Sequence, residues 1–283
     1  MTIDIGDLVN RTRRDFLEAP DELWVSTRLT AAVADSAGTF SIDLALLGFE
    51  EQNLLAPGVL VEVGTEQCHV VDLSGSELTV RRAARGTRAT AHLSGAEVLI
   101  APPYGRTTIF DAVAESIVDL SPPLYHRDVV EREVDEDGLV ELPEGTDGVL
   151  SVRLSRHWAT LPFEQVGDTK LRIYGCDPGE DVTVTVRSGF TYPASEQQSL
   201  HSLGVRDEWA RIVVVGAAAQ LISAKPLSTS WQEFVSSQLR TEGYPVETPG
   251  RIRDSLLRYH QFLIDRAAAA QLRRHPPEQV YTT

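Results

Sequence analysis

The histidine in this chain that is most suggestive of chemistry is His92, which ends the loop segment GTRATAH. A histidine that acts as a general base needs a nucleophile within reach and an acidic group that orients its ring. Thr87 and Thr90 are the nearest hydroxyl groups in the sequence, and a Thr87/His92 pair would define a hydrolase. No Gly-x-Ser-x-Gly elbow accompanies the pair. We therefore favour a structural role, in which His92 hydrogen-bonds the backbone of its own loop, and we predict no catalytic residues.

The patterns that could bind a metal are equally weak. The sequence DEDG at residues 135–138 resembles the start of a calcium loop, but the glutamate that would complete the ligand set is missing, so we interpret it as a hairpin turn. Cys68 and His69 are neighbours in an alternating strand, so their side chains point to opposite faces and cannot share one ion. The chain has only two cysteines, which indicates neither a metal cluster nor a disulfide framework. We expect no metal and no cofactor.

The composition is that of a globular protein with an acidic surface. Hydrophobic residues make up 42% and charged residues 24% of the 283 positions. The 26 basic residues against 41 acidic ones give a net charge of −15, which disfavours non-specific binding of nucleic acid but suits a wall along which DNA slides. The N-terminus has no apolar stretch like that of a signal peptide, and no segment is long enough to span a membrane. We therefore expect synthesis in the cytoplasm and no membrane partner.

The elements that must position these residues follow from the hydrophobic periodicity. It predicts an α+β fold in which antiparallel barrel or sandwich regions combine with a helical bundle formed by the N-terminal, middle and C-terminal helices. The expected parts are an N-terminal helix in residues 1–24, a small antiparallel β domain in 25–103, a connecting amphipathic helix in 104–125, a second β region in 126–193, and C-terminal helices with an extended tail in 194–283. The predicted strands are 26–33, 39–44, 59–63, 68–73, 78–82 and 96–100 in the first β region, and 129–134, 138–142, 149–154, 171–174 and 182–188 in the second.

Two helices carry the clearest signals. In residues 107–120 the apolar positions recur every three or four residues, and Pro122 and Pro123 then end the helix. The segment Pro122–Tyr125 also matches the PPxY ligand of WW domains, but we favour the helix stop. The second helix, 205–223, contains Gly216 among alanines, and we expect it to pack closely against helices 107–120 and 249–273.

The segment Arg81–Tyr125 resembles segments of tailed-bacteriophage virion proteins of the neck and tail. In these, a strand that ends in an Arg-Gly-Thr loop is followed by an alanine and a histidine, and then by Gly-Ala-x-Val and a helix. The matching residues here are Arg82, Arg85, Gly86, Thr87, Ala91, His92, Gly95, Ala96 and Val98. Trp209–Leu221 is similar to an apolar helix of head-to-tail connector proteins, and it too precedes a long polar helix. Connector adaptors are mainly helical, so the two β regions would be additions.

The resemblance implies a structural protein of a phage virion, and most specifically a head-to-tail adaptor. Such an adaptor forms a homo-oligomeric ring between the portal protein and the tail or stopper proteins, and DNA passes through the lumen without specific binding. The alternative is a tail-tip or baseplate protein that contacts neighbouring subunits or host surface glycans. The acidic segment 131–137 is a candidate for the lumenal wall, or is simply a solvated hairpin. The residues expected at assembly interfaces are Arg85, Gly86, Thr87, His92, Gly216, Val280 and Tyr281.

Overall fold

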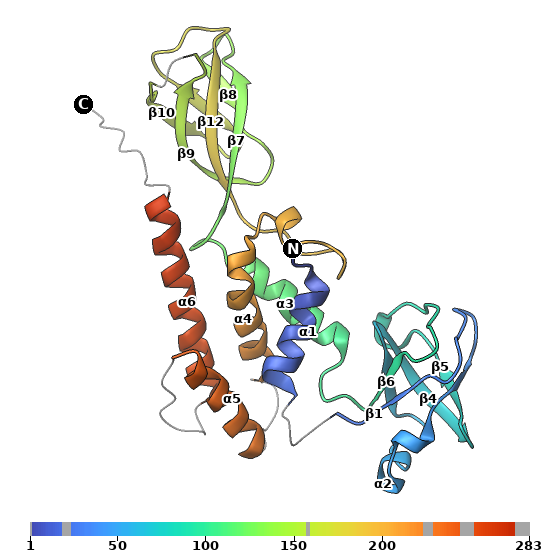
Figure 1. Cartoon of the computed structure of the whole chain (residues 1–283). Coiled ribbons are helices and arrows are strands. Elements are labelled where there is room, and N and C mark those ends of the chain that lie inside the picture. The colour runs from blue at the N-terminus through green and yellow to red at the C-terminus, as the bar shows by residue number, and fades with distance from the viewer. Residues whose placement is uncertain (1, 19–23, 157–158, 223–228, 244–251, 275–283) are drawn as a thin grey trace. The chain divides into compact units, whose positions relative to one another are not determined.

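The computed structural model describes residues 2–18, 24–156, 159–222, 229–243 and 252–274. It divides into two compact units, each built from separate stretches of the chain. The first unit comprises Met1–Leu8, Val113–Gly216 and Leu256–Thr283, and the second comprises Val9–Ala112 and Ala217–Ser255. Figure 1 shows the elements of both units.

The second unit contains a six-stranded antiparallel sheet in the order β1-β6-β3-β4-β5-β2. Its strands are β1 (Ser26–Arg28), β2 (Thr39–Ser41), β3 (Leu60–Val63), β4 (Glu66–Ser74), β5 (Glu77–Arg81) and β6 (Glu97–Ile100). The sheet curls, and a bridge between Leu29 and Ile42 joins the ends of its two edge strands. Thr30 N donates to Ser41 O at 2.8 Å across the same junction. Curling pairs backbone groups that the edges of a flat sheet would expose to solvent.

The inner face of this curled sheet is an aliphatic core with one aromatic ring. Side chains on alternate positions of the strands point inward, as the pleat requires. The segment between β2 and β3 contributes to the same core and contains a 3-10 turn (Leu44–Leu46) and the short helix α2 (Phe49–Gln52). The buried members are Leu29, Val33, Phe40, Ile42, Leu47, Leu55, Val61, Val63, Cys68, Val70, Leu78, Val80, Val98 and Ile100.

The first unit contains a small sandwich of two three-stranded antiparallel sheets. One sheet has the order β7-β12-β9 and the other β10-β11-β8. The strands are β7 (His126–Glu133), β8 (Leu139–Glu141), β9 (Thr146–Leu154), β10 (Phe163–Val166), β11 (Lys170–Ile173) and β12 (Asp181–Ser188). The alternating sequence of β12 turns Val182, Val184 and Val186 into the core between the sheets, and Thr183 and Thr185 therefore lie on the outer face.

The helices lie close to the predicted segments; those at the N-terminus and at 107–120, 205–223 and 249–273 are shorter than predicted, and the one predicted at 229–239 is two residues longer. Near the N-terminus, α1 (Ile5–Thr12) continues as one π-helical turn (Arg13–Leu17), against which α5 (Thr229–Thr241) packs. The other long helices are α3 (Arg106–Val118), α4 (Ala210–Ile222) and α6 (Ile252–Arg274), and short 3-10 turns lie at Ala84–Gly86, His201–Leu203 and Asp207–Trp209. No helix within the described residues is long and apolar enough to cross a membrane.

The α+β class and its antiparallel sheets are confirmed. The predicted strand 26–33 is wrong in length, because β1 ends at Arg28 and the chain then follows the curl through isolated bridges at Leu29 and Val33. We also missed β10, whose side chains are mostly exposed and therefore show no apolar alternation. The predicted helix stop is confirmed, because α3 ends four residues before Pro122, and Leu124 of the PPxY match is fully buried.

Candidate functional site: the charged core of the curled sheet

Glu66 is a buried carboxylate at the start of β4. Its side chain has no exposed surface. It shares a face of the strand with Cys68 and Val70, which belong to the apolar core. A carboxylate in such a place is tolerated only when it is paired and hydrogen-bonded, so its partners define the site.

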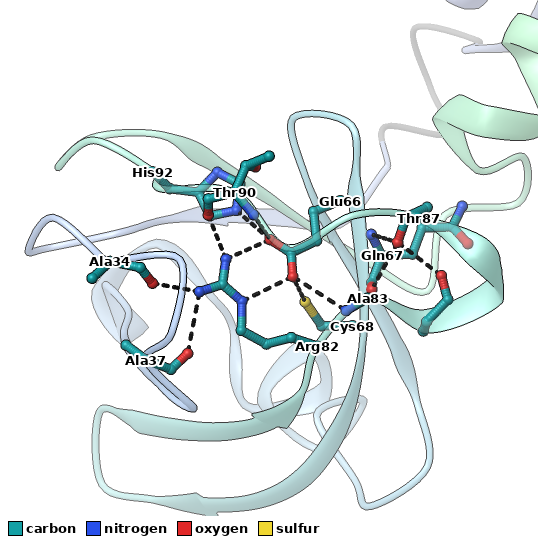
Figure 2. A network of polar contacts seen from close by, with 11 residues as sticks. Ala34, Ala37, Glu66, Gln67, Cys68, Arg82, Ala83, Thr87, Thr90 and His92 are labelled. Atoms are coloured by element: carbon teal, nitrogen blue, oxygen red, sulfur yellow. Dashed lines mark hydrogen bonds and ion pairs between the residues drawn. The ribbon is translucent and has the colours of Figure 1, made fainter.

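Arg82 is the principal partner, and two nitrogens of its guanidinium group donate hydrogen bonds to the Glu66 carboxylate. Its Nε lies 2.8 Å from Oε1 of Glu66, and its Nη2 lies 2.5 Å from Oε2. The same guanidinium donates to the carbonyl groups of Ala34, Ala37 and Thr90, and its centre lies 5.3 Å from the Phe40 ring. Figure 2 shows how these bonds converge from separate loops. One buried ion pair therefore fixes segments around residues 34–37, 82–83 and 90–92.

His92 and two backbone amides complete the shell around the carboxylate. His92 Nε2 lies 2.8 Å from Oε2, while the amides of Thr90 and Ala83 donate to the carboxylate at 3.1 and 3.3 Å. Burial alone would raise the pKa of Glu66, but the hydrogen bonds from Arg82, His92 and the amides outweigh it and lower the pKa to about 2. Glu66 is therefore ionised at neutral pH.

The Arg-Gly-Thr loop is held by its threonine. The Thr87 hydroxyl accepts a hydrogen bond from Gln67 N at 3.1 Å and donates to Ala84 O at 2.8 Å. Arg85 and Gly86 between these anchors are exposed, and both have a positive φ, 52° and 80°. A non-glycine residue rarely adopts that conformation, so the anchors on either side impose it on Arg85.

Thr87 and His92 do not form the pair that the hydrolase hypothesis requires. The ring nitrogen Nε2 of His92 bonds to Glu66, and the Thr87 hydroxyl bonds to the backbone of residues 67 and 84. In Figure 2 the two side chains lie on opposite sides of the Glu66 carboxylate. Burial, followed by the adjacent Glu66, raises the pKa of the Cys68 thiol to about 12, so this thiol is not a thiolate nucleophile at neutral pH. Within the described part of the chain, no group of three or more His, Cys, Asp or Glu side chains could hold a metal ion.

A second buried glutamate connects the curled sheet to the start of α3. Glu62 of β3 is 2% exposed and accepts hydrogen bonds from the backbone N of Arg106 at 2.6 Å and from Gln67 Nε2 at 3.1 Å. Gln67 also donates to the Thr107 hydroxyl at 3.0 Å. Burial raises the pKa of Glu62, although the amide of Arg106 and the side chain of Gln67 lower it in part. A Cβ atom on Gly105 would collide with Gln67 Nε2, so a larger residue there would displace Gln67 from its bonds to Glu62 and Thr107.

Gly216 lies where the parts of α3, α4 and α6 that belong to the first unit approach one another. A Cβ atom at this position would lie 2.7 Å from Nε2 of His260 on α6 and still closer to the Ser116 hydroxyl of α3. Ser116, which is fully buried, donates to Val213 O of α4 at 3.0 Å. The predicted close approach at Gly216 is therefore present, and the residue is buried inside the chain. A single bundle through all the helices stays a prediction.

The structure thus gives different positions to the residues predicted for assembly. Thr87 and His92 help to fix the loop, Arg85 and Gly86 are exposed on it, and Gly216 is buried elsewhere. Val280 and Tyr281 lie outside the described residues.

The sequence analysis missed Glu66, around which the whole network is built. The available signal was its place on the apolar face of an alternating strand, two residues before Cys68. An acidic residue in that register indicates a buried partner.

The chain matches no protein-family model, and no curated protein is significantly similar to it.

Proposed function

We propose that this protein is a structural component of a phage virion, and specifically a head-to-tail adaptor that forms a ring between portal and tail. The observation that carries the proposal is that residues of the Arg-Gly-Thr motif hold their own loop against the sheet. Arg82 and His92 bond to Glu66, and Thr87 bonds to the backbone of β4. Three of the residues that carry the resemblance therefore anchor the loop to the sheet, which supports a scaffolding role.

The exposed part of this loop supports an interface role. Arg85 and Gly86 project from anchors that leave their backbone little freedom. A surface that is already fixed before binding loses little conformational entropy when a neighbouring subunit contacts it. The acidic charge of the chain agrees with a lumen through which DNA passes without being held.

A tail-tip or baseplate protein is the second candidate. It is favoured by an open groove of about 280 Å³ on the sandwich, lined by arginine, threonine and serine side chains together with Val129 and Leu154.

Imaging tests the two positions. The purified chain should assemble into rings with a central channel, visible by negative-stain electron microscopy. Antibody labelling of intact particles should place the chain between head and tail. Labelling at the far end of the tail would favour the second candidate, and a chain that stays monomeric and is absent from particles would contradict both.

A further inference from the structure

His260 of α6 is a half-buried histidine at the place where α3, α4 and α6 approach one another in the first unit. Its ring lies against the backbone of α4, because a Cβ atom on Gly216 would be 2.7 Å from Nε2 and 3.1 Å from Cε1 of the ring. The Nε2 atom is buried and has no hydrogen-bond partner within the described residues. A titratable nitrogen is therefore enclosed in a close helix contact.

The neighbouring polar group of the crossing is already used. Ser116 of α3 is fully buried, and its hydroxyl donates to Val213 O of α4 at 3.0 Å. This bond joins α3 to α4 three residues before Gly216, where the ring of His260 packs. The crossing thus combines one satisfied hydroxyl with one ring nitrogen that makes no hydrogen bond.

Few charges face the ring. The only charged residue of α4, Arg211, lies five positions from Gly216 and hence on another side of that helix. Within the described residues, the single charge that acts on the ring is Asp119, directly after the end of α3. The α6 residues on the same side as His260, three and four positions away, are all apolar: Leu256, Leu257, Leu263 and Ile264.

The neutral ring suits this environment better than the charged one. Burial lowers the pKa of His260 below its ordinary value of 6.5, and Asp119 raises it only in part. Protonation makes both ring nitrogens donors, so a buried Nε2–H would have no acceptor. A histidine whose folded pKa is lowered contributes stability above the unfolded value of 6.5, and this contribution is lost as the pH falls through the folded pKa. Mild acid therefore destabilises the crossing.

We propose that His260 makes the three-helix crossing a proton-sensitive contact, in which protonation of the ring loosens α6 from α3 and α4. At neutral pH the uncharged ring packs on Gly216. In mild acid the imidazolium shifts the population toward an open crossing. Near its end α6 has a separate attachment, because Gln271 Nε2 donates to Tyr125 O at 2.8 Å. The inference concerns the first unit alone and does not depend on the proposed function.

Hydrogen exchange of the full chain, compared between about pH 7.5 and about pH 5.5, tests the proposal in a range where histidines rather than ordinary carboxylates titrate. After correction for the intrinsic exchange rate, the amides of residues 213–219 and 256–264 should open about threefold or more often at the lower pH. The amides of β12 in the same unit should not respond. His260→Gln cannot titrate, so this variant should lose the response.

Three further variants make the result specific. His126→Gln and His201→Gln remove other histidines of the first unit and should keep the acid response of the crossing. Asp119→Asn removes an exposed charge that favours the imidazolium, so the response should move to lower pH. This variant leaves the ring itself unchanged and therefore carries the test if His260→Gln does not fold.

Three outcomes would overturn the proposal. Equal protection of the crossing at both pH values in the wild type would show that protonation does not loosen it. An undiminished response in His260→Gln would assign the sensitivity to another group. A pKa of the His260 ring above 6.5, measured by NMR, would mean that the folded crossing favours the imidazolium. Each of these results leaves the proposed ring and its place in the virion to be decided by imaging.

Discussion

The two β regions differ in where their charged side chains lie. In the curled sheet, Glu66 and Arg82 place a charged network beside an apolar core, and that network fixes three loop segments. The sandwich has a core of aliphatic side chains with one phenylalanine and one cysteine at its border. Two of its arginines, Arg127 and Arg153, lie on the outer face and line a groove.

The difference shows where each region is sensitive to substitution. A hydrophobic core tolerates changes that conserve volume, since its contacts are non-directional. A buried ion pair depends on both partners, because removal of one leaves the other charged in a poorly solvated site. We therefore expect the removal of one buried charged side chain to destabilise the curled sheet. Volume-conserving substitutions in the sandwich core should leave the sandwich largely intact.

The largest effect is expected for Glu66→Ala. It leaves Arg82 buried without its carboxylate, so the curled sheet should lose about 3–5 kcal/mol of stability. Hydrogen exchange of the β4 and β5 amides, followed by mass spectrometry in the full chain, reports this region separately. The exposed Glu133→Ala is the control and should change stability by less than about 0.5 kcal/mol. Unchanged protection in Glu66→Ala would contradict the role of the network.

The corresponding change in the sandwich is Leu171→Ala. Leu171 is fully buried, and the cavity left behind should cost about 2–5 kcal/mol. Exchange should accelerate for the β11 and β12 amides. Leu171→Met, which nearly conserves volume, should cost less than about 1.5 kcal/mol. If the two substitutions were equally damaging, the sandwich core would not have the tolerance that the comparison assigns to it.

Low pH should destabilise the curled sheet more than the sandwich, by a smaller amount than the two substitutions above. The pKa of Glu66 is about 2 in the folded protein and near 4.5 in the unfolded chain. A lowered folded pKa contributes stability above the unfolded value, and this contribution is lost as the pH falls from about 4.5 to about 2. The difference between wild type and Glu66→Ala, measured by exchange of β4, should therefore shrink across this range. A difference that stays constant down to pH 2 would show that the carboxylate charge is not the stabilising element.

The smallest effect is expected for Glu62→Gln. It compares the two buried glutamates of the curled sheet, Glu62 and Glu66. Burial raises the pKa of Glu62 and so disfavours its ionised form. Replacing the carboxyl group with a neutral amide should therefore cost little stability. The amide oxygen of glutamine can still accept the hydrogen bond from Arg106 N. The free energy of unfolding, measured with urea at pH 7, should change by at most about 1 kcal/mol. A loss as large as that of Glu66→Ala would mean that the two buried glutamates are equivalent, against their different partners.

Much of the secondary structure could be predicted because it depends on local pattern. The alternation in 182–188 predicts β12, and the apolar stripe with Pro122 and Pro123 predicts α3 and its end. Period and proline chemistry act over a few residues, so they are visible in the sequence. The exposed β10 shows the limit, because a strand without a buried face carries no such pattern.

The sequence by itself determined the α+β class, the Asp135–Gly138 turn and the small-residue surface around Gly216. Only the tertiary structure decided that Glu66 receives Arg82, His92 and two amides, and that Arg127 and Arg153 share one groove. The partners of Glu66 lie 16 to 26 residues away in sequence. Their meeting depends on how the sheet curls and on the register of its strands, and a change of one residue in register would move every side chain to the other face.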